Sequence, residues 1–126
     1  MVSLAAEEPV EDLTAYGFTH YRAEFPPVLL YSKGMQRAFI YQALPIWALL
    51  EEQLALEKPT LVHCHAGQDR TGVVLAGYLV TYRGEAPERA LARVRVVKPS
   101  AMAAEGYAEV LDLLRPGVVP DPSRLL

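Results

Sequence analysis

The sequence predicts an α/β fold, in which a central, mostly parallel sheet is flanked by helices. The first observation is a β-favouring stretch at 60–63, which leads through a loop with two glycines into an apolar run at 73–80. This order is typical of a strand followed by a buried helix. The second observation is the helical spacing of apolar residues over 35–57, and the third is a strand-like alternation over 18–23. Because helices follow the strands, we expect the strands to run parallel.

Length and composition favour a single domain over residues 1–126. The chain is 52% apolar and has a net charge of −3, which argues against bulk binding of nucleic acid. Its one cysteine excludes an internal disulfide. No apolar run approaches the roughly 20 residues that span a bilayer, and no basic segment precedes an apolar one as in a secretory signal. We therefore expect a cytoplasmic protein without membrane attachment, and we leave its oligomeric state open.

Helices are expected at 9–16, 35–57, 70–83 and 87–97, and a last helix is expected after Ser100 as its N-cap. Pro45 should kink or split the long helix, and Gly84 should end the third. The stretch 24–34, with two adjacent prolines, is expected to be a loop, and 116–126 a flexible tail. The long helix and the last helix should each bury one apolar face. These faces hold Met35, Phe39, Ala43, Ile46, Leu50 and Leu54 in the long helix, and Ala103, Tyr107, Val110, Leu111 and Leu114 in the last.

The loop before 73–80 combines residues that suit the binding of one anion. Cys64 is the only cysteine, and backbone N–H groups, a helix N-terminus and a guanidinium would all favour its thiolate. Gly67 permits a tight turn. Arg70 presents a fork of donors that can hold two oxygens of a phosphate, and Thr71 can place a hydroxyl near the sulfur. The pattern therefore predicts a site for a tetrahedral oxyanion at a helix N-terminus.

The stretch 63–72 resembles the signature of the cysteine-dependent protein tyrosine phosphatase superfamily, His-Cys-x-x-Gly-x-x-Arg-Ser/Thr-Gly. All six fixed positions are present, as His63, Cys64, Gly67, Arg70, Thr71 and Gly72. The resemblance implies a protein-tyrosine-phosphatase-like fold of the dual-specificity type, here with a shortened N-terminus. It also implies a phosphate-binding loop, made of His65, Ala66, Gly67, Gln68, Asp69 and Arg70.

The resemblance further implies a reaction that needs neither a metal nor a cofactor. The Cys64 thiolate would accept the phosphoryl group, and water would then hydrolyse the cysteinyl-phosphate. Arg70 and the loop amides would hold the equatorial oxygens, with His63 and Thr71 in supporting roles.

Other interpretations of the loop fit less well. A lone cysteine in a strand is usually a small hydrophobic residue, but Arg70 and the glycines favour a site. His63, Cys64 and His65 could suggest a metal cluster. Adjacent strand residues point to opposite faces, however, and no second ligand pair follows at zinc spacing, so we expect no metal. Rhodanese and arsenate-reductase loops also use a cysteine, but they match the His-to-Gly pattern less completely.

The general acid that protonates the leaving oxygen has three candidates. We predict Asp69 as the general acid. The resemblance suggests that the corresponding Asp can serve as the acid in the branch of the superfamily whose loop reads Lys-Asp-Arg-Thr. In this chain, Gln68 stands in place of that Lys. A carboxylate that only orients loop amides, or that pairs with a downstream basic residue, is an equally open interpretation of Asp69. Glu24 is the alternative, since it lies nearest to the place of the family's upstream Asp, which the stretch 24–34 lacks. Asp12 is the third candidate.

Two downstream features also bear on the site. Arg95 and Lys98 resemble the basic residues that the family places beside its pocket, although a basic run is also typical of a solvated face. The turn at 99–102 matches a family pattern, but Tyr107 falls near the position of a Gln that positions the hydrolytic water. Gln68 is the remaining candidate for that role.

The expected partner is a phosphorylated protein, at phosphotyrosine, phosphoserine or phosphothreonine, or a small phosphomonoester. One alternative is a phosphate-binding module with little catalysis, which the missing upstream Asp suggests. Another is a phosphatase for a phosphoinositide or an RNA 5′-phosphate.

Overall fold

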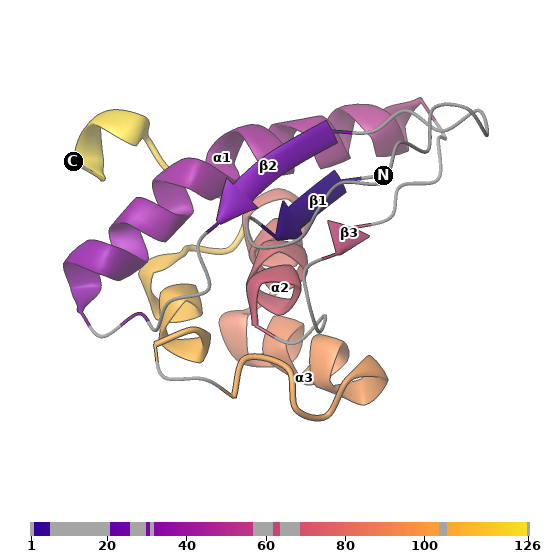
Figure 1. Ribbon diagram of the computed structural model, residues 1–126, viewed down its shortest axis with the longest axis vertical. Coiled ribbons are helices and arrows are strands. Elements are labelled where there is room, and N and C mark those ends of the chain that lie inside the picture. The colour runs from indigo at the N-terminus through magenta and orange to yellow at the C-terminus, as the bar shows by residue number, and fades with distance from the viewer. Residues whose placement is uncertain are drawn as a thin grey trace.

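The computed structural model describes residues 2–5, 21–25, 30, 32–56, 62–63, 69–103 and 106–125. Within these ranges, α2 lies at the centre of the molecule and contacts α1, α3 and η2 (Figure 1). The elements in chain order are β1 (Val2–Ala5), β2 (Tyr21–Phe25), α1 (Lys33–Ala55), β3 (Val62–His63), α2 (Arg70–Arg83), α3 (Pro87–Val97), and the 3-10 helices η2 (Ala108–Leu113) and η3 (Pro122–Arg124). The helix predicted at 9–16 lies outside the described residues.

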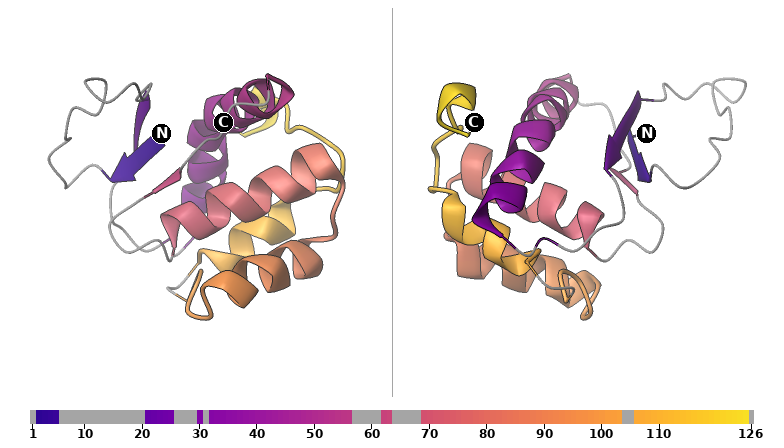
Figure 2. Two further views of the ribbon diagram at one scale, coloured as in Figure 1. Left: turned by 90° about the vertical axis from the view of Figure 1, so that its right-hand side faces the viewer. Right: turned by 60° about the vertical axis from the view of Figure 1, so that its left-hand side comes forward.

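The three described strands form one parallel sheet in the order β2-β1-β3. Ser3 pairs with Arg22 on one side and with His63 on the other, and the register between β1 and β2 then shifts by one residue before the Ala5–Phe25 pair. Among the described elements, α1, α2 and α3 all lie on one side of this sheet (Figure 2). Helices on its other face stay a prediction. Because parallel strands end at a common edge, the chain leaves β2 and β3 on the same side of the molecule.

The sequence predicted a loop over the whole of 24–34, but part of this segment belongs to β2 and α1. Glu24 and Phe25 extend β2 beyond the predicted end of that strand, because the ladder with β1 continues as far as the Ala5–Phe25 pair. At the other end of the segment, α1 begins at Lys33. Ser32 caps it, because its hydroxyl accepts a hydrogen bond from the Met35 N–H at 3.2 Å.

Helix α1 runs unbroken through Pro45, so the predicted split does not occur. Four of the six predicted core positions are buried, but Met35 and Leu54 are exposed, because they lie near the two ends of the helix. The buried face also includes Trp47, whose indole N–H donates to the Val74 carbonyl of α2 at 2.8 Å. Burial of this wide face against α2 offsets the backbone hydrogen bond that Pro45 removes.

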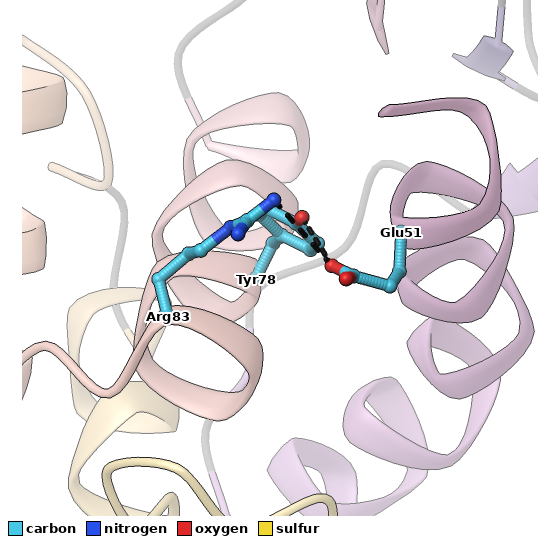
Figure 3. A network of polar contacts seen from close by, with 3 residues as sticks. All are labelled: Glu51, Tyr78 and Arg83. Atoms are coloured by element: carbon cyan, nitrogen blue, oxygen red, sulfur yellow. Dashed lines mark hydrogen bonds and ion pairs between the residues drawn. The ribbon is translucent and has the colours of Figure 1, made fainter. Parts of the chain in front are cut away.

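Helix α2 has the bounds that the sequence predicted, and Gly84 ends it with a left-handed φ of 73°. Gly77 lets the helix approach α1, because a Cβ there would overlap the Trp47 ring. Further along, the Tyr78 hydroxyl donates to the Glu51 carboxylate at 2.5 Å, and Arg83 lies 3.7 Å from the same carboxylate (Figure 3). These contacts join α1 to α2 away from the predicted loop.

The last predicted helix is wrong in its start and its type. Ser100 lies in a turn, and the helical segment that follows is the 3-10 helix η2, with Tyr107 as its N-cap. The left-handed backbone of Met102 (φ 58°) and Gly106 (φ 89°) interrupts a continuous helix. The predicted apolar residues from Tyr107 to Leu114 are nevertheless buried, whereas Ala103 is exposed.

Two long-range contacts join the C-terminal part of the chain to earlier elements. Gly106 lies against the Leu30 backbone so closely that a Cβ would overlap the Leu30 carbonyl, which also accepts a hydrogen bond from the Gln36 side chain at 3.2 Å. The Gly117 N–H donates to the Val80 carbonyl of α2 at 2.8 Å. The start of the predicted flexible tail, 116–126, is therefore held against α2.

Candidate active site

The predicted loop joins the carboxyl end of β3 to the N-terminus of α2. His63 ends the strand, Asp69 is the N-cap, and Arg70 and Thr71 lie in the first helical turn. This strand-to-helix order confirms the context that the sequence predicted for the motif. The other loop residues lie outside the described residues, and their roles stay predictions: Cys64, His65, Ala66, Gly67 and Gln68.

The first turn of α2 is suited to bind an anion. The Val73 N–H donates to the Asp69 carbonyl at 2.9 Å and closes the first helical hydrogen bond. The N–H groups before it have no acceptor within the helix, and the helix dipole adds partial positive charge at this end. The Asp69 side chain makes no capping hydrogen bond to the helix. A negatively charged ligand at this end would satisfy these donors.

Two polar side chains of this turn are buried. Arg70 and Thr71 are each 6% exposed, although both follow the loop directly. In the described part of the chain, Thr71 Oγ1 is a buried hydroxyl without a hydrogen-bond partner. A buried hydroxyl that makes no hydrogen bond is uncommon and costly, and here it lies in the helical turn that directly follows the predicted loop.

The turn 98–102, which follows α3, packs against the first turn of α2. A Cβ on Gly72 would lie 3.2 Å from Met102 Cγ and 3.5 Å from Ala101 Cβ, so the two segments are in close contact and a methyl group there would press on the Met102 side chain. The carbonyls of Ala101 and Met102 accept hydrogen bonds from the Arg95 guanidinium, at 2.9 and 3.4 Å. The sequence analysis missed this role of Arg95, because its partners are backbone atoms, which no residue type identifies. The one signal in the sequence was Gly72, a small residue that permits another segment to pack closely against the helix.

The alternative acid, Glu24, lies in β2 at the same edge of the sheet. Ser3 of β1 pairs with both Arg22 of β2 and His63 of β3, so Arg22 and His63 lie at the same height in the sheet. Glu24 comes two residues after Arg22, toward the edge at which the chain leaves β3 for the loop. However, β1 separates the two strands, and two strand spacings place their backbones about 10 Å apart. Asp69 is adjacent to Arg70 in the chain, which favours it over Glu24 by position.

Tyr107 belongs to the core rather than to the site. It is buried, and its ring meets Phe39 edge-on, with the centroids 5.9 Å apart and the planes at 83°.

Of the two basic residues predicted beside the pocket, Lys98 lines an open groove of about 530 Å³ between α2 and α3, and Thr71 and Gly72 line the same groove. Arg95, by contrast, lies half-buried against the turn.

Comparisons with known proteins agree with this arrangement. The sequence model described as "PTP-SAK: Swiss Army Knife protein, DSP-PTPase phosphatase domain" matches residues 1–121. This chain belongs to that family. It is therefore a dual-specificity-like member of the protein tyrosine phosphatase superfamily, as the motif predicted.

Two solved structures of one protein, Tk-PTP, resemble this member of the PTP-SAK family. The crystal structure of Tk-PTP in the active form shares 28% sequence identity and a TM-score of 0.74, over 89% of this chain and 74% of that chain. A crystal structure of the same protein in a mutant form shares 28% identity and a TM-score of 0.73, over 89% of this chain and 73% of that chain. The fold is thus protein-tyrosine-phosphatase-like, and the protein is a phosphatase whose substrate is phosphorylated.

None of the helices within the described ranges combines the length and the hydropathy that a membrane crossing needs.

Proposed function

We propose that this phosphatase hydrolyses phosphomonoesters through a cysteinyl-phosphate intermediate, without a metal, and that its substrates are proteins carrying phosphotyrosine, phosphoserine or phosphothreonine. The observation that carries the proposal is the placement of Arg70 and Thr71 in the first turn of a helix that follows β3 and the cysteine-containing loop. Family membership supports the phosphatase activity, and the two buried polar side chains support the site.

In the first step, the Cys64 thiolate attacks phosphorus, a sulfur–phosphorus bond forms, and the bond to the leaving oxygen breaks. The leaving oxygen takes a proton from Asp69, which becomes a carboxylate. The guanidinium of Arg70 and the N–H groups of the first turn of α2 stabilise the negative charge on the equatorial oxygens. The hydroxyl of Thr71, buried and without a partner among the described residues, is suited to donate to the sulfur.

In the second step, water attacks phosphorus and the sulfur–phosphorus bond breaks, which releases inorganic phosphate and restores the thiolate. The Asp69 carboxylate takes the proton from the attacking water. Both steps thus use the same residues, and the enzyme returns to its initial protonation state.

The decisive test is the hydrolysis of an aryl phosphate in the presence of EDTA by the wild type and by Cys64→Ser. We expect multiple turnovers by the wild type, inhibition by vanadate, and loss of turnover in the variant, because a serine hydroxyl is a far weaker nucleophile at neutral pH than a thiolate. Turnover that persists in Cys64→Ser would exclude the cysteinyl-phosphate route. Thermal unfolding of both proteins controls for folding.

The missing upstream Asp favours a second candidate, a phosphate-binding module with little catalysis. That candidate predicts binding of a phosphopeptide by the wild type without any release of phosphate. A panel of phosphopeptides, a phosphoinositide and an RNA 5′-phosphate then separates protein substrates from the other two classes, because the preferred class should show the highest kcat/KM.

A further inference from the structure

We propose that Arg95 is a positioning residue, which fixes the anion-binding end of α2 through the turn 98–102. The inference concerns the site of the proposed phosphatase reaction and rests on it. Arg95 would act on the site through backbone carbonyls and through Gly72, rather than by direct contact with the substrate.

The first step of the argument is the geometry of the guanidinium. Arg95 Nε donates to the Ala101 carbonyl at 2.9 Å, and Nη2 donates to the Met102 carbonyl at 3.4 Å. Both of these residues are buried, with Ala101 fully inaccessible and Met102 2% exposed. A planar fork of donors can satisfy two successive carbonyls at once, whereas an ammonium concentrates its donors on one atom. Arg95 therefore holds two adjacent peptide groups in a fixed orientation.

The second step is that this turn needs an external support. Met102 has a φ of 58°, and no other non-glycine residue in the described ranges has a positive φ. A left-handed backbone is unfavourable for a side chain such as methionine and persists only where its surroundings hold it. Two local hydrogen bonds help, from the Ala101 N–H to the Lys98 carbonyl at 2.9 Å and from the Ala103 N–H to the Ser100 carbonyl at 3.3 Å. The guanidinium adds one hydrogen bond at the Met102 carbonyl itself and one at the carbonyl of the preceding Ala101.

The third step is the contact between the turn and α2. Met102 and Ala101 lie against Gly72, which directly follows Arg70 and Thr71 in the first helical turn. With no side chain on Gly72 to absorb a shift, a displacement of the turn changes the support of this helical turn directly. Anion binding by preorganised donors is sensitive to small displacements, on the order of 1 Å. Arg95 is thereby coupled to the site.

Arg93 provides a matched comparison on the same helix. Its guanidinium pairs with the Glu85 carboxylate at 2.7 Å, and its side chain is 69% exposed. The conservative change of Arg to Lys at either position keeps the charge and removes the fork. Only at Arg95 does the fork hold the turn that contacts α2, so the two variants should differ.

The experiment compares the wild type, Arg95→Lys and Arg93→Lys. The dissociation constant of inorganic phosphate is measured by titration of backbone amide resonances, which does not require turnover. We expect Arg95→Lys to weaken phosphate binding by about tenfold and Arg93→Lys to leave it unchanged, because a small displacement of donors is costly only where the fork supports the site. Unchanged binding in Arg95→Lys would overturn the inference, since charge alone would then be sufficient.

Amide hydrogen exchange in the same samples tests the structural half of the inference, whether or not the protein is a phosphatase. The Val73 amide, which closes the first hydrogen bond of α2, should exchange about tenfold faster in Arg95→Lys, because its local support is weakened. The Ala90 amide, which bonds to Ala86 at the start of α3, should not change. If both amides accelerate, or if Arg95→Lys fails to fold, Arg95 supports the whole fold and the positioning role is wrong.

The two proposals can therefore fail separately. Loss of the cysteinyl-phosphate route would appear as turnover in Cys64→Ser, without any bearing on the exchange of Val73. Failure of the inference would appear as normal phosphate binding and normal exchange in Arg95→Lys, in an enzyme that still depends on Cys64.

Discussion

Two threonines of α2, ten positions apart, have opposite environments. Thr81 is 1% exposed, and its hydroxyl donates to the Gly77 carbonyl at 2.8 Å. Thr71 is 6% exposed, and among the described atoms its hydroxyl has no hydrogen-bond partner. The two side chains are similarly buried, so they differ in whether the hydroxyl makes a hydrogen bond. The comparison separates the half of the helix that stabilises the fold from the turn that is proposed to bind the phosphoryl group.

The second half of α2 is extensively bonded to its surroundings. Tyr78 joins it to Glu51 of α1, the Val80 carbonyl accepts from Gly117, and Gly77 packs against the Trp47 ring. The first turn instead has N–H donors without an acceptor inside the helix and, among the described atoms, the unpartnered Thr71 hydroxyl. A buried hydroxyl without a partner lowers stability, and such a group can be retained where a ligand or a reacting atom uses it.

The largest effect is expected at the N-cap. Asp69→Asn should lower kcat on an alkyl phosphate by about 10²-fold and on an aryl phosphate by much less, because a poor leaving group depends on the general acid. Rates for both substrates over a range of pH measure it. Glu24→Gln is the matched control, and should leave the ratio of the two rates unchanged. If Glu24→Gln shows the leaving-group dependence instead, the assignment of Asp69 is wrong.

In the stabilising half of α2, Gly77→Ala should lower the free energy of unfolding by about 1–3 kcal/mol, because the new methyl group would overlap the Trp47 ring. Urea unfolding measures this change. The KM for an aryl phosphate should stay that of the wild type at a temperature where the variant is folded. A large rise in KM would show that the two halves of α2 are coupled.

The two threonines allow a direct test, because Thr→Val keeps the shape of the side chain and removes the hydroxyl. Thr71→Val should lower kcat about tenfold through loss of the donor to the leaving sulfur, with stability unchanged or slightly raised, since a buried hydroxyl without a partner is removed. Thr81→Val should lower stability by about 1 kcal/mol and leave kcat unchanged. The opposite pattern in the pair would contradict the proposed division of the helix.

The smallest effect is a pH dependence of stability at the Tyr78–Glu51 contact. Burial, and then the hydrogen bond to Glu51, raise the pKa of Tyr78 above its usual value of 10.0, although Arg83 opposes the shift. The folded state therefore keeps this proton more tightly than the unfolded chain. The contribution is fully present below about pH 10 and is lost as the pH rises through the folded pKa. Unfolding free energies of the wild type should decline more steeply above about pH 10 than those of Tyr78→Phe.

The elements that the sequence predicted well have strong local signals. An apolar run and a following glycine defined α2 at both ends, and the spacing of Phe39, Ala43 and Ile46 identified the buried face of α1. The same spacing failed at Met35 and Leu54, because the ends of a helix extend past the core that its middle contacts.

The errors depend on tertiary structure. No local sequence feature indicates a left-handed backbone at Met102, so the sequence predicted a continuous helix after Ser100 where the structure has a turn followed by η2. The role of Arg95 was also inaccessible, because its acceptors are two carbonyls whose positions depend on how the turn packs against Gly72. In the site, the motif predicted where α2 begins, whereas the choice between Asp69 and Glu24 depends on side-chain geometry and stays a prediction.

The contact of Gly106 with the Leu30 carbonyl has a consequence for biosynthesis. The two residues are 76 positions apart, so the ribosome adds Gly106 long after Leu30. Until then Leu30 lacks its contact with Gly106. Nascent chains that stall before residue 106 should for this reason be cleaved more readily at Leu30 than chains that extend past residue 106.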